Sequence, residues 1–277
     1  MSSLFLKPIA ILQYDVDNGP AYFADYLRGE KIPFEHIRVN HGDAVPKSIA
    51  PLSGLCLMGG SASVNDDLPW IGEVLSLTRE AIANDVPVIG HCLGGQLLSK
   101  ALGGTITAST ELEIGWGDCA VEHNELVHEW LGKVRKFPAY QWYFESFSIP
   151  ENATRILRGA NCENQAFVFG PHIGLQPHIE VDEKVICMWA DKDRAMLKKL
   201  SGPGVQSHSK MIADTKKNLA AMRAVTQQIY GVWLANVVER QMSDTATVIA
   251  SYLYRRCQYC PRTMNRRPSC CHLPMSS

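Results

Sequence analysis

The sequence predicts an α/β fold built on a doubly wound, mostly parallel sheet with a β-rich antiparallel excursion. Over residues 8–104, short apolar runs alternate with segments of helical spacing, an order typical of a parallel sheet covered by helices. Two of the apolar runs end in glycine-rich turns, at residues 59–60 and 90–95. In such sheets these turns lie beyond the carboxyl ends of the strands, where ligands bind.

The first half of the chain is expected to alternate strictly between strands and helices. Its strand candidates are apolar runs or alternating segments, at residues 8–16, 34–40, 52–58 and 86–89. Its helix candidates carry apolar residues at helical spacing, at residues 19–31, 70–84 and 97–102. Glycines at positions 103 and 104 close the last of these helices.

The second half begins with strands and ends with helices. Segments rich in β-formers and aromatic residues predict strands at residues 113–122, 140–149, 155–157, 165–169 and 172–178. We expect these strands to form an antiparallel excursion that returns to the main sheet. Two further helices are expected, at residues 182–200 and 210–239, and we find no internal repeat.

One domain is expected over residues 1–240, followed by a basic, cysteine-containing tail over residues 241–277 that is disordered or appended. From residue 243 onward the chain holds five arginines against a single acid, Asp244. Cysteines at positions 257 and 260 and a Cys-Cys-His run at residues 270–272 suggest zinc, but the spacing suits a tetrahedral site poorly. We therefore expect no metal, with structural zinc or a basic docking patch as alternatives.

The composition is ordinary for a globular protein, with 46% hydrophobic and 20% charged residues. A formal net charge of -1 gives no reason to expect nucleic acid or an anionic membrane as a partner. No apolar run approaches the roughly 18 residues of a membrane span, and the N-terminus lacks the features of a signal peptide. Nine scattered cysteines suit a reducing compartment, so we expect a cytoplasmic protein.

Cys92 stands in the most informative turn, between an apolar run and a helix, in the pattern Gly-x-Cys-x-Gly. This is the thiol counterpart of the nucleophile elbow, in which a strained turn exposes the nucleophile at the end of a strand. The positive end of the helix dipole also favours a thiolate there. Two alternatives remain from the turn alone: a buried core cysteine, or a glycine-rich turn that cradles phosphate.

His178 and Glu180 supply the base and the orienting acceptor that a cysteine nucleophile needs. Two residues apart on a strand, their side chains project from the same face. A His-x-Glu pair alone is more often a solvated face, but here it follows a cysteine elbow. His172 lacks such an acceptor, because Gly174 stands at the equivalent position, and it is expected to be structural.

The remaining histidines and cysteines have simpler interpretations. Alternation along the strand points His91 away from the face of Cys92, and we expect it to pack or to bond locally. The other cysteines before the tail lack both an elbow and a base, and they are expected to be core or bystander residues: Cys56, Cys119, Cys162 and Cys187. Acyl transfer also needs an oxyanion hole, for which the N–H of Leu93 and the turn at residues 59–60 are the candidates.

The motifs together resemble those of the class I, triad-type glutamine amidotransferases. The matching motifs are Met58-Gly59-Gly60, Ser63-Val64-Asn65-Asp66-Asp67, Gly90-His91-Cys92-Leu93-Gly94-Gly95-Gln96, Leu102-Gly103-Gly104, Glu113-Ile114-Gly115-Trp116 and Gly174-Leu175-Gln176-Pro177-His178-Ile179-Glu180. Their order and spacing fit over roughly residues 8–240. The chain is most similar to the stand-alone group that resembles the amidotransferase domain of GMP synthase. The resemblance implies a flavodoxin-like fold and no cofactor.

The resemblance also implies a role for each matched residue. Cys92 attacks the side-chain amide of glutamine, which gives a γ-glutamyl thioester and ammonia, and His178 protonates the ammonia and then activates water. Gly60 and Leu93 match the oxyanion-hole positions. Gln96 matches a position that helps to hold glutamine.

Three departures from the family pattern bear on the substrate. Ser61 replaces the proline of the family's Gly-Gly-Pro turn, and Pro177 precedes the histidine where the family has an aromatic residue or cysteine. The family's Trp-His-Gly-Asp segment, which shapes the glutamine pocket, is Trp-Tyr-Phe-Glu at residues 142–145. We therefore take Tyr143 and Glu145 as candidate substrate-binding residues, together with Gly59 of the turn.

Three functions are consistent with these observations. The leading hypothesis is a glutamine amidotransferase or glutaminase that passes ammonia to an unidentified acceptor enzyme. A γ-glutamyl peptidase that cleaves peptides such as glutathione keeps the same triad and is favoured by the altered segment at residues 142–145. A non-catalytic regulatory relative is the third, if Pro177 displaces the histidine that follows it.

Overall fold

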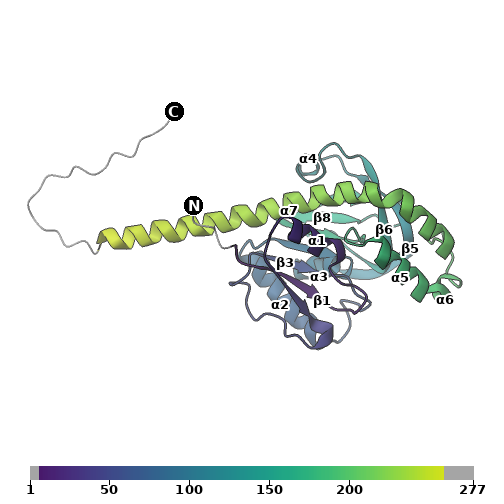
Figure 1. Cartoon of the computed structure of the whole chain (residues 1–277), viewed down its shortest axis with the longest axis horizontal. Helices are drawn as coiled ribbons and strands as arrows, with labels where there is room; N and C mark the ends of the chain where they lie inside the picture. Colours follow the sequence, from purple (N-terminus) through teal and green to yellow (C-terminus); the bar gives the residue numbers. More distant parts are fainter. Residues whose placement is uncertain (1–5, 259–277) are drawn as a thin grey trace, which may run out of the picture. The chain divides into compact units, whose positions relative to one another are not determined.

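Nine strands form one mixed sheet in the part of the chain that the structure describes. They are β1 (Ile9–Gln13), β2 (Phe34–Arg38), β3 (Gly54–Leu57), β4 (Val88–His91), β5 (Ile106–Val121), β6 (Lys136–Phe147), β7 (Thr154–Arg158), β8 (Ala166–Phe169) and β9 (His172–Leu175). Their order across the sheet is β2-β1-β3-β4-β9-β8-β7-β5-β6 (Figure 1). In this order, the first five strands (β2, β1, β3, β4 and β9) pair in parallel with one another. The remaining pairs, beginning with β9 and β8, are antiparallel. The predicted fold class is therefore confirmed.

The computed structural model describes residues 6–258, and from residue 245 it describes the backbone alone. The helices are α1 (Ala21–Gly29), α2 (Pro69–Ala83), α3 (Leu93–Ala101), α4 (Glu125–Leu131), α5 (Glu183–Lys192), α6 (Arg194–Leu197) and α7 (His208–Gln258), with a short 3-10 turn, η1 (Val39–His41). Residues up to Gln241 belong to one compact unit, and the described residues from Met242 onward belong to a second. None of the described helices combines the length and the apolar character that a membrane span requires.

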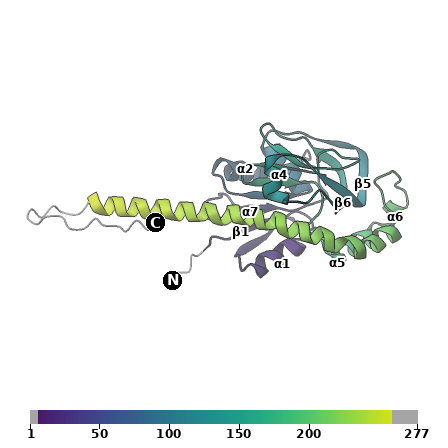
Figure 2. The same cartoon turned by 90° about the horizontal axis from the view of Figure 1, so that it is seen from above.

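The two faces of the sheet bury separate cores. Ile9 and Ile11 of β1 pack with Phe23 of α1 and Trp233 of α7, all fully buried. The alternate residues of the same strand pack on the other face, against α2 and α3. Figure 2 shows α1 and α2 on opposite sides of β1. Because successive side chains of a strand point to opposite faces, the apolar runs of the parallel strands serve both cores.

The carboxyl ends of β1, β3 and β4 lie side by side at one edge of the sheet. Leu12 of β1 pairs with Leu57 of β3, and Leu57 pairs in turn with Gly90 of β4. The segments that follow these strands therefore meet at this edge. They carry Asp15, the turn at residues 59–60, and Cys92.

The strand expected at residues 172–178 is shorter than predicted, because β9 ends at Leu175. Pro177 lacks an N–H and cannot continue a ladder of hydrogen bonds. His178 instead makes an isolated bridge, donating its N–H to the carbonyl of Tyr140 at 2.8 Å. The prediction that His178 and Glu180 lie on a strand was wrong, although their side chains still point the same way.

Several helix boundaries also differ from expectation. Helix α4 was not predicted from the sequence, and the Asn124 side chain caps it by accepting from Val127 N–H. The helix predicted at residues 182–200 is divided into α5 and α6. The last helix extends beyond residue 239 to Gln258. The division of the chain at residue 240 stays a prediction, and the Cys-Cys-His run at residues 270–272 lies outside the described residues.

Candidate active site

Cys92 occupies a sharp turn between β4 and α3. Its φ is 50° and its ψ is -109°, a conformation that costs a residue with a side chain about 1–3 kcal/mol. A Cβ atom at Gly90 would collide with the backbone of Gly94, and one at Gly94 would collide with the backbone of Leu57. Only glycines fit at these two positions, so the Gly-x-Cys-x-Gly pattern is a requirement of the turn.

The thiol of Cys92 faces a cavity of about 540 Å³ while remaining 5% exposed. Its Sγ lies 3.8 Å from the carbonyl oxygen of Trp142 and 3.9 Å from Nε2 of Gln176. The backbone N–H of Cys92 donates to the carbonyl of Leu175 at 2.8 Å, which fixes the turn against β9. A thiol that is fixed in position at the wall of a cavity can act as a nucleophile on a molecule bound there.

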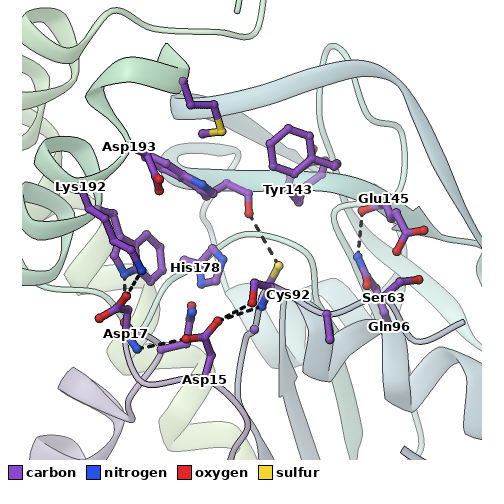
Figure 3. A pocket seen from close by; sticks show the side chains of 18 residues that line it. Asp15, Asp17, Ser63, Cys92, Gln96, Tyr143, Glu145, His178, Lys192 and Asp193 are labelled. Atoms are coloured by element: carbon purple, nitrogen blue, oxygen red, sulfur yellow. Dashed lines mark hydrogen bonds and ion pairs between the residues drawn. The ribbon is translucent and has the colours of Figure 1, made fainter. Parts of the chain in front are cut away.

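His178 stands beside Cys92 at the same cavity (Figure 3). Its Nδ1 lies 2.6 Å from Oε1 of Glu180, and both side chains are buried. Because a carboxylate only accepts hydrogen bonds, Nδ1 carries the proton in this pair, which leaves Nε2 to act on the thiol. The edge of the Trp189 ring packs against the imidazole, with centroids 4.9 Å apart.

Electrostatics keep a proton on His178. Burial alone would lower the pKa of His178, but Glu180 and Cys92 together raise it to about 10. Burial likewise opposes ionisation of Glu180, yet His178 and His91 hold the pKa of its carboxyl below the usual value. At neutral pH the pair is therefore an imidazolium beside a carboxylate, and the imidazolium is ready to give a proton to a leaving group.

The two glycines of the turn after β3 lie against the side chains of His178 and Leu93. A Cβ atom at Gly59 would come within 2.7 Å of Cε1 of His178, and one at Gly60 would come within 2.9 Å of the Leu93 side chain. Gly60 also lines the cavity. Leu93 is the first residue of α3, so its N–H is among those that find no acceptor within the helix. The structure thus brings both candidate oxyanion-hole residues beside Cys92.

Gln96 and Glu145 line the cavity on the far side of Cys92 from His178 (Figure 3), whereas Gly59, also a candidate for substrate binding, lies against His178 and is not part of the lining. Gln96 of α3 is buried, and its Nε2 donates to the backbone carbonyl of Glu145 at 2.8 Å. The carboxylate of Glu145 and the ring of Tyr143 belong to the same wall, which β6 supplies. The altered segment at residues 142–145 therefore does shape the cavity that the thiol faces.

A buried polar network holds Tyr143 in this wall. Its hydroxyl donates to the carboxylate of Glu113 and lies 2.9 Å from Nε2 of Gln165. Glu113 also accepts from Gln165 at 2.7 Å and from Asn161 at 3.1 Å. Glu113 matched a family motif in the sequence but had no predicted role. Its buried carboxylate, which accepts from three side chains, anchors the ring that contacts Cys92.

Several residues of the cavity wall beside His178 were not predicted, among them the following four. Asp15 and Asp17 follow β1, and Trp189 and Lys192 belong to α5. Trp189 donates from Nε1 to the carbonyl of Asp17 at 2.9 Å, and Lys192 forms an ion pair with the carboxylate of Asp17. The aspartates could have been found from their place at the carboxyl end of a strand. No local signal marks the two residues of α5.

The sequence profile of the family described as "Glutamine amidotransferase class-I" matches residues 21–185, more than half of the chain. The chain belongs to this family. Enzymes of the class I glutamine amidotransferase family hydrolyse glutamine and transfer the ammonia to an acceptor. Membership of the family supports this general activity for the chain. The predicted resemblance is confirmed.

Individual relatives agree with membership of the class I glutamine amidotransferases. A glutamine amido transferase from Methylobacillus flagellatus is 41% identical, with a TM-score of 0.81 over 83% of this chain and 95% of that one. The glutamine amidotransferase-like protein YfeJ of Salmonella typhimurium is 27% identical over 150 residues, and the match spans 63% of its length. GMP synthase of Helicobacter pylori is 28% identical over 154 residues, only 28% of that enzyme.

Four buried histidines and cysteines away from the cavity make structural contacts. His172 accepts the Val88 N–H on Nδ1 at 3.2 Å, in keeping with a structural role. His91 is fully buried and packs against the rings of Phe23 and Tyr230, as expected, and its 3.0 Å hydrogen bond goes to Tyr230 of α7 and not to a residue near it in the sequence. Burial raises the pKa of Cys56 and of Cys119, which leaves both as inert thiols. The described residues contain no cluster of ligands suited to a metal ion.

Proposed function

We propose that the chain hydrolyses the side-chain amide of glutamine through a γ-glutamyl thioester on Cys92. One observation carries the proposal: Cys92 on its strained turn shares a cavity with His178, whose ring is fixed by the buried carboxylate of Glu180. Nucleophile, general acid–base and orienting acceptor are the parts that cysteine-dependent acyl transfer requires. Family membership supports the same chemistry.

In the first half of the reaction, the proton of the Cys92 thiol lies on Nε2 of His178, and the resulting thiolate attacks the amide carbon of glutamine so that a carbon–sulfur bond forms. Negative charge develops on the amide oxygen, where the backbone N–H groups of Gly60 and Leu93 would stabilise it. The carbon–nitrogen bond then breaks, and the nitrogen leaves as ammonia with the proton from His178. Glu180 stabilises the imidazolium before this transfer and fixes the tautomer after it.

In the second half, water replaces ammonia beside His178. The neutral imidazole takes a proton from the water as it attacks the thioester carbon, and the carbon–sulfur bond breaks. Glutamate leaves, and Cys92 and His178 return to their starting states. The net reaction consumes glutamine and water and yields glutamate and ammonia, with no cofactor.

The substrate's α-amino acid end would lie on the side of Cys92 opposite His178. Gln96 and Glu145 form that end of the cavity, and the carboxylate of Glu145 suits an α-ammonium group. Gln96 holds the Glu145 backbone in place through its 2.8 Å hydrogen bond. We assign these two residues to substrate binding, together with Tyr143 of the wall, and we assign Gly59 to leaving room for His178.

The ammonia would pass to a separate acceptor enzyme. Glutamine-hydrolysing GMP synthase is among the proteins that the chain resembles, but the match covers only 28% of that enzyme. One subunit of the glutamine-hydrolysing GMP synthase from Thermoplasma acidophilum is 23% identical to this chain over 84% of its own length. An ammonia-consuming partner on another chain is therefore part of the proposal.

Ammonia release from glutamine by the purified chain tests the proposal. We expect steady-state hydrolysis that Cys92→Ala abolishes and Cys187→Ala leaves intact, because Cys187 lies on α5 outside the cavity. The absence of glutamine turnover in the folded wild-type chain would refute it. Equal turnover by Cys92→Ala would also refute it.

A γ-glutamyl peptidase is the second candidate, because the cavity is also lined by residues of α5 that departing ammonia would not reach, although the carboxylates there oppose an acidic leaving group. Beyond His178 the cavity continues to Lys192 on α5, farther than departing ammonia requires. Dipeptide release from glutathione without glutamine turnover would support this activity. The third candidate, a non-catalytic relative, is disfavoured because Pro177 does not displace His178 from Glu180.

A further inference from the structure

The cavity at Cys92 has two arms. Figure 3 shows Ser63, Gln96 and Glu145 on one side of Cys92, which we name the glutamyl arm. The opposite arm, on the side of His178, carries Asp15, Asp17, Lys192 and Asp193, and Trp189 lies on the same side because its ring packs against His178. We name it the leaving-group arm. A cavity of about 540 Å³ falls in the range of sites that enclose drug-sized ligands.

The position of His178 decides which half of a substrate each arm receives. A general acid must lie within hydrogen-bond reach of the nitrogen that it protonates. The leaving nitrogen of an amide attacked by Cys92 therefore points toward His178, and anything bonded to that nitrogen continues into the leaving-group arm. Glutamine places nothing there, because its leaving group is ammonia.

An aromatic side chain and a carboxylate give the leaving-group arm its chemistry. Trp189 is 6% exposed and meets Trp142 edge to face, with ring centroids 5.9 Å apart, so its ring is held as a rigid apolar wall. Burial would raise the pKa of Asp15, but hydrogen bonds from Ser61 and from the N–H of Asp17 lower it, so this carboxylate stays charged.

The charges of the leaving-group arm favour a cation over an anion. Carboxylates outnumber cationic groups among the described residues of this arm, because Asp15, Asp17 and Asp193 face Lys192, while the imidazolium of His178 is already paired with Glu180. Lys192 is already paired with the Asp17 carboxylate. A leaving group that ends in a carboxylate would have to displace Asp17 from Lys192 and would still face the two other acids.

We propose that this arm binds the leaving amine of γ-glutamyl amides and selects amines that carry a second, positively charged group. The substrate class is therefore a γ-glutamyl amide of a diamine. The step is the proposed thioester chemistry, on which the inference rests: the carbon–nitrogen bond breaks, the amine leaves with the proton of His178, and water then releases glutamate. No oxidant or cofactor is involved.

The experiment compares four substrates with the full chain. Three are γ-glutamyl amides of matched length, made from 1,3-diaminopropane, propylamine and β-alanine, so that only the distant group changes from cation to neutral to anion. Glutamine is the fourth. We expect kcat/KM to fall in that order across the three amides, with about tenfold between the first and the last. The difference should shrink when the ionic strength rises from about 0.05 M to about 0.5 M.

The outcomes distinguish failure of the inference from failure of the proposed function. Turnover of glutamine with equal rates for the three amides, or with the β-alanine amide preferred, would overturn the inference and leave the proposed function intact. Turnover of none of the four would overturn both. Preference for the diamine amide without glutamine turnover would support the inference and the thioester chemistry, and it would refute glutamine as the substrate.

A pair of variants separates selectivity from folding. Asp193 lies between α5 and α6 but caps neither helix with its side chain, so Asp193→Asn removes a charge and no cap. We expect it to lower the preference for the diamine amide over the propylamide about threefold. Asp191→Asn, in the last turn of α5 and outside the cavity, should leave that ratio unchanged. An unchanged ratio in Asp193→Asn with a folded chain would contradict the assignment.

Discussion

The imidazole Nδ1 of His178 lies 2.6 Å from Oε1 of Glu180, and neither side chain is more than 3% exposed. The pair is local in sequence, yet it does not depend on a strand, because β9 ends at Leu175. The ring is instead fixed by its bond to Glu180 and by edge-to-face packing with Trp189. Gly59 leaves room for the ring, because a Cβ atom there would come within 2.7 Å of it. Each of these contacts can be tested separately.

Glu180→Gln should lower kcat for glutamine by about 10³-fold, because the neutral amide no longer fixes the tautomer or stabilises the imidazolium. Since Glu180 is the main group that raises the pKa of His178 to about 10, the basic limb of the pH–rate profile should move to lower pH. Glu183→Gln, an exposed acid at the start of α5, is the control. A basic limb that stays near pH 10 would contradict the assigned role of Glu180.

Gly59→Ala should reduce activity by about 10²-fold or more, because its Cβ would come within 2.7 Å of His178 and displace the ring. Gly72→Ala is the matched control, since Gly72 lies within α2 and a Cβ atom there would meet no other atom within 4 Å. Alanine in a helix should stabilise the chain by about 0.5–1 kcal/mol and leave kcat unchanged. Rates and thermal unfolding of both variants check the pair, and full activity in Gly59→Ala would refute the positioning argument.

Tyr143→Phe should destabilise the chain by about 1–3 kcal/mol, because the buried Glu113 carboxylate loses a donor. The chain offers a contrasting hydroxyl in Tyr14, which is buried without a hydrogen-bond partner among the described residues. Tyr14→Phe should be neutral or slightly stabilising. Urea unfolding of both variants measures the contrast, and equal effects would show that the Glu113 network does not hold the wall.

His172 should make the fold less stable in mild acid. Burial lowers the pKa of His172 to about 4, so the unfolded chain binds the proton more tightly, and stability falls as pH drops from about 6.5 toward 4. At about pH 5 the expected loss is about 2 kcal/mol. Protonation also breaks the bond that Nδ1 accepts from the Val88 N–H.

The His172→Asn variant isolates this effect, because an amide oxygen can accept the same N–H without titrating. Its unfolding free energy should change less between pH 7 and pH 5 than that of the wild type, when both are measured in urea. An identical pH dependence in the two proteins would assign the acid sensitivity to other groups.

The parts of the fold and site that could be predicted are those encoded locally. The turn at Cys92 follows from its glycines, since only they fit against the neighbouring backbone, and the apolar runs define the parallel strands. The pairing of His178 with Glu180 follows from their two-residue spacing. The predicted places of Gly60, Gln96 and Glu145 around the cavity also agree with the structure, while their roles stay proposals.

The parts that could not be predicted depend on contacts between distant segments. Trp189 and Lys192 reach the cavity only because α5 docks on the loop that follows β1, as the bond from Trp189 to Asp17 shows. His91 finds its partner on α7, far along the chain. The early end of β9, in contrast, is a local effect that could have been predicted, because Pro177 has no N–H to donate to a neighbouring strand.

The covalent state of Cys92 during turnover tests the central claim most directly. The chain is mixed with glutamine, quenched in acid within the steady state, and its peptides are mapped by mass spectrometry. We predict a γ-glutamyl group on the peptide that contains Cys92 in the wild type, and none in Cys92→Ser. Release of glutamate and ammonia while Cys92 stays unmodified, or with the adduct on another cysteine such as Cys187, would contradict the account.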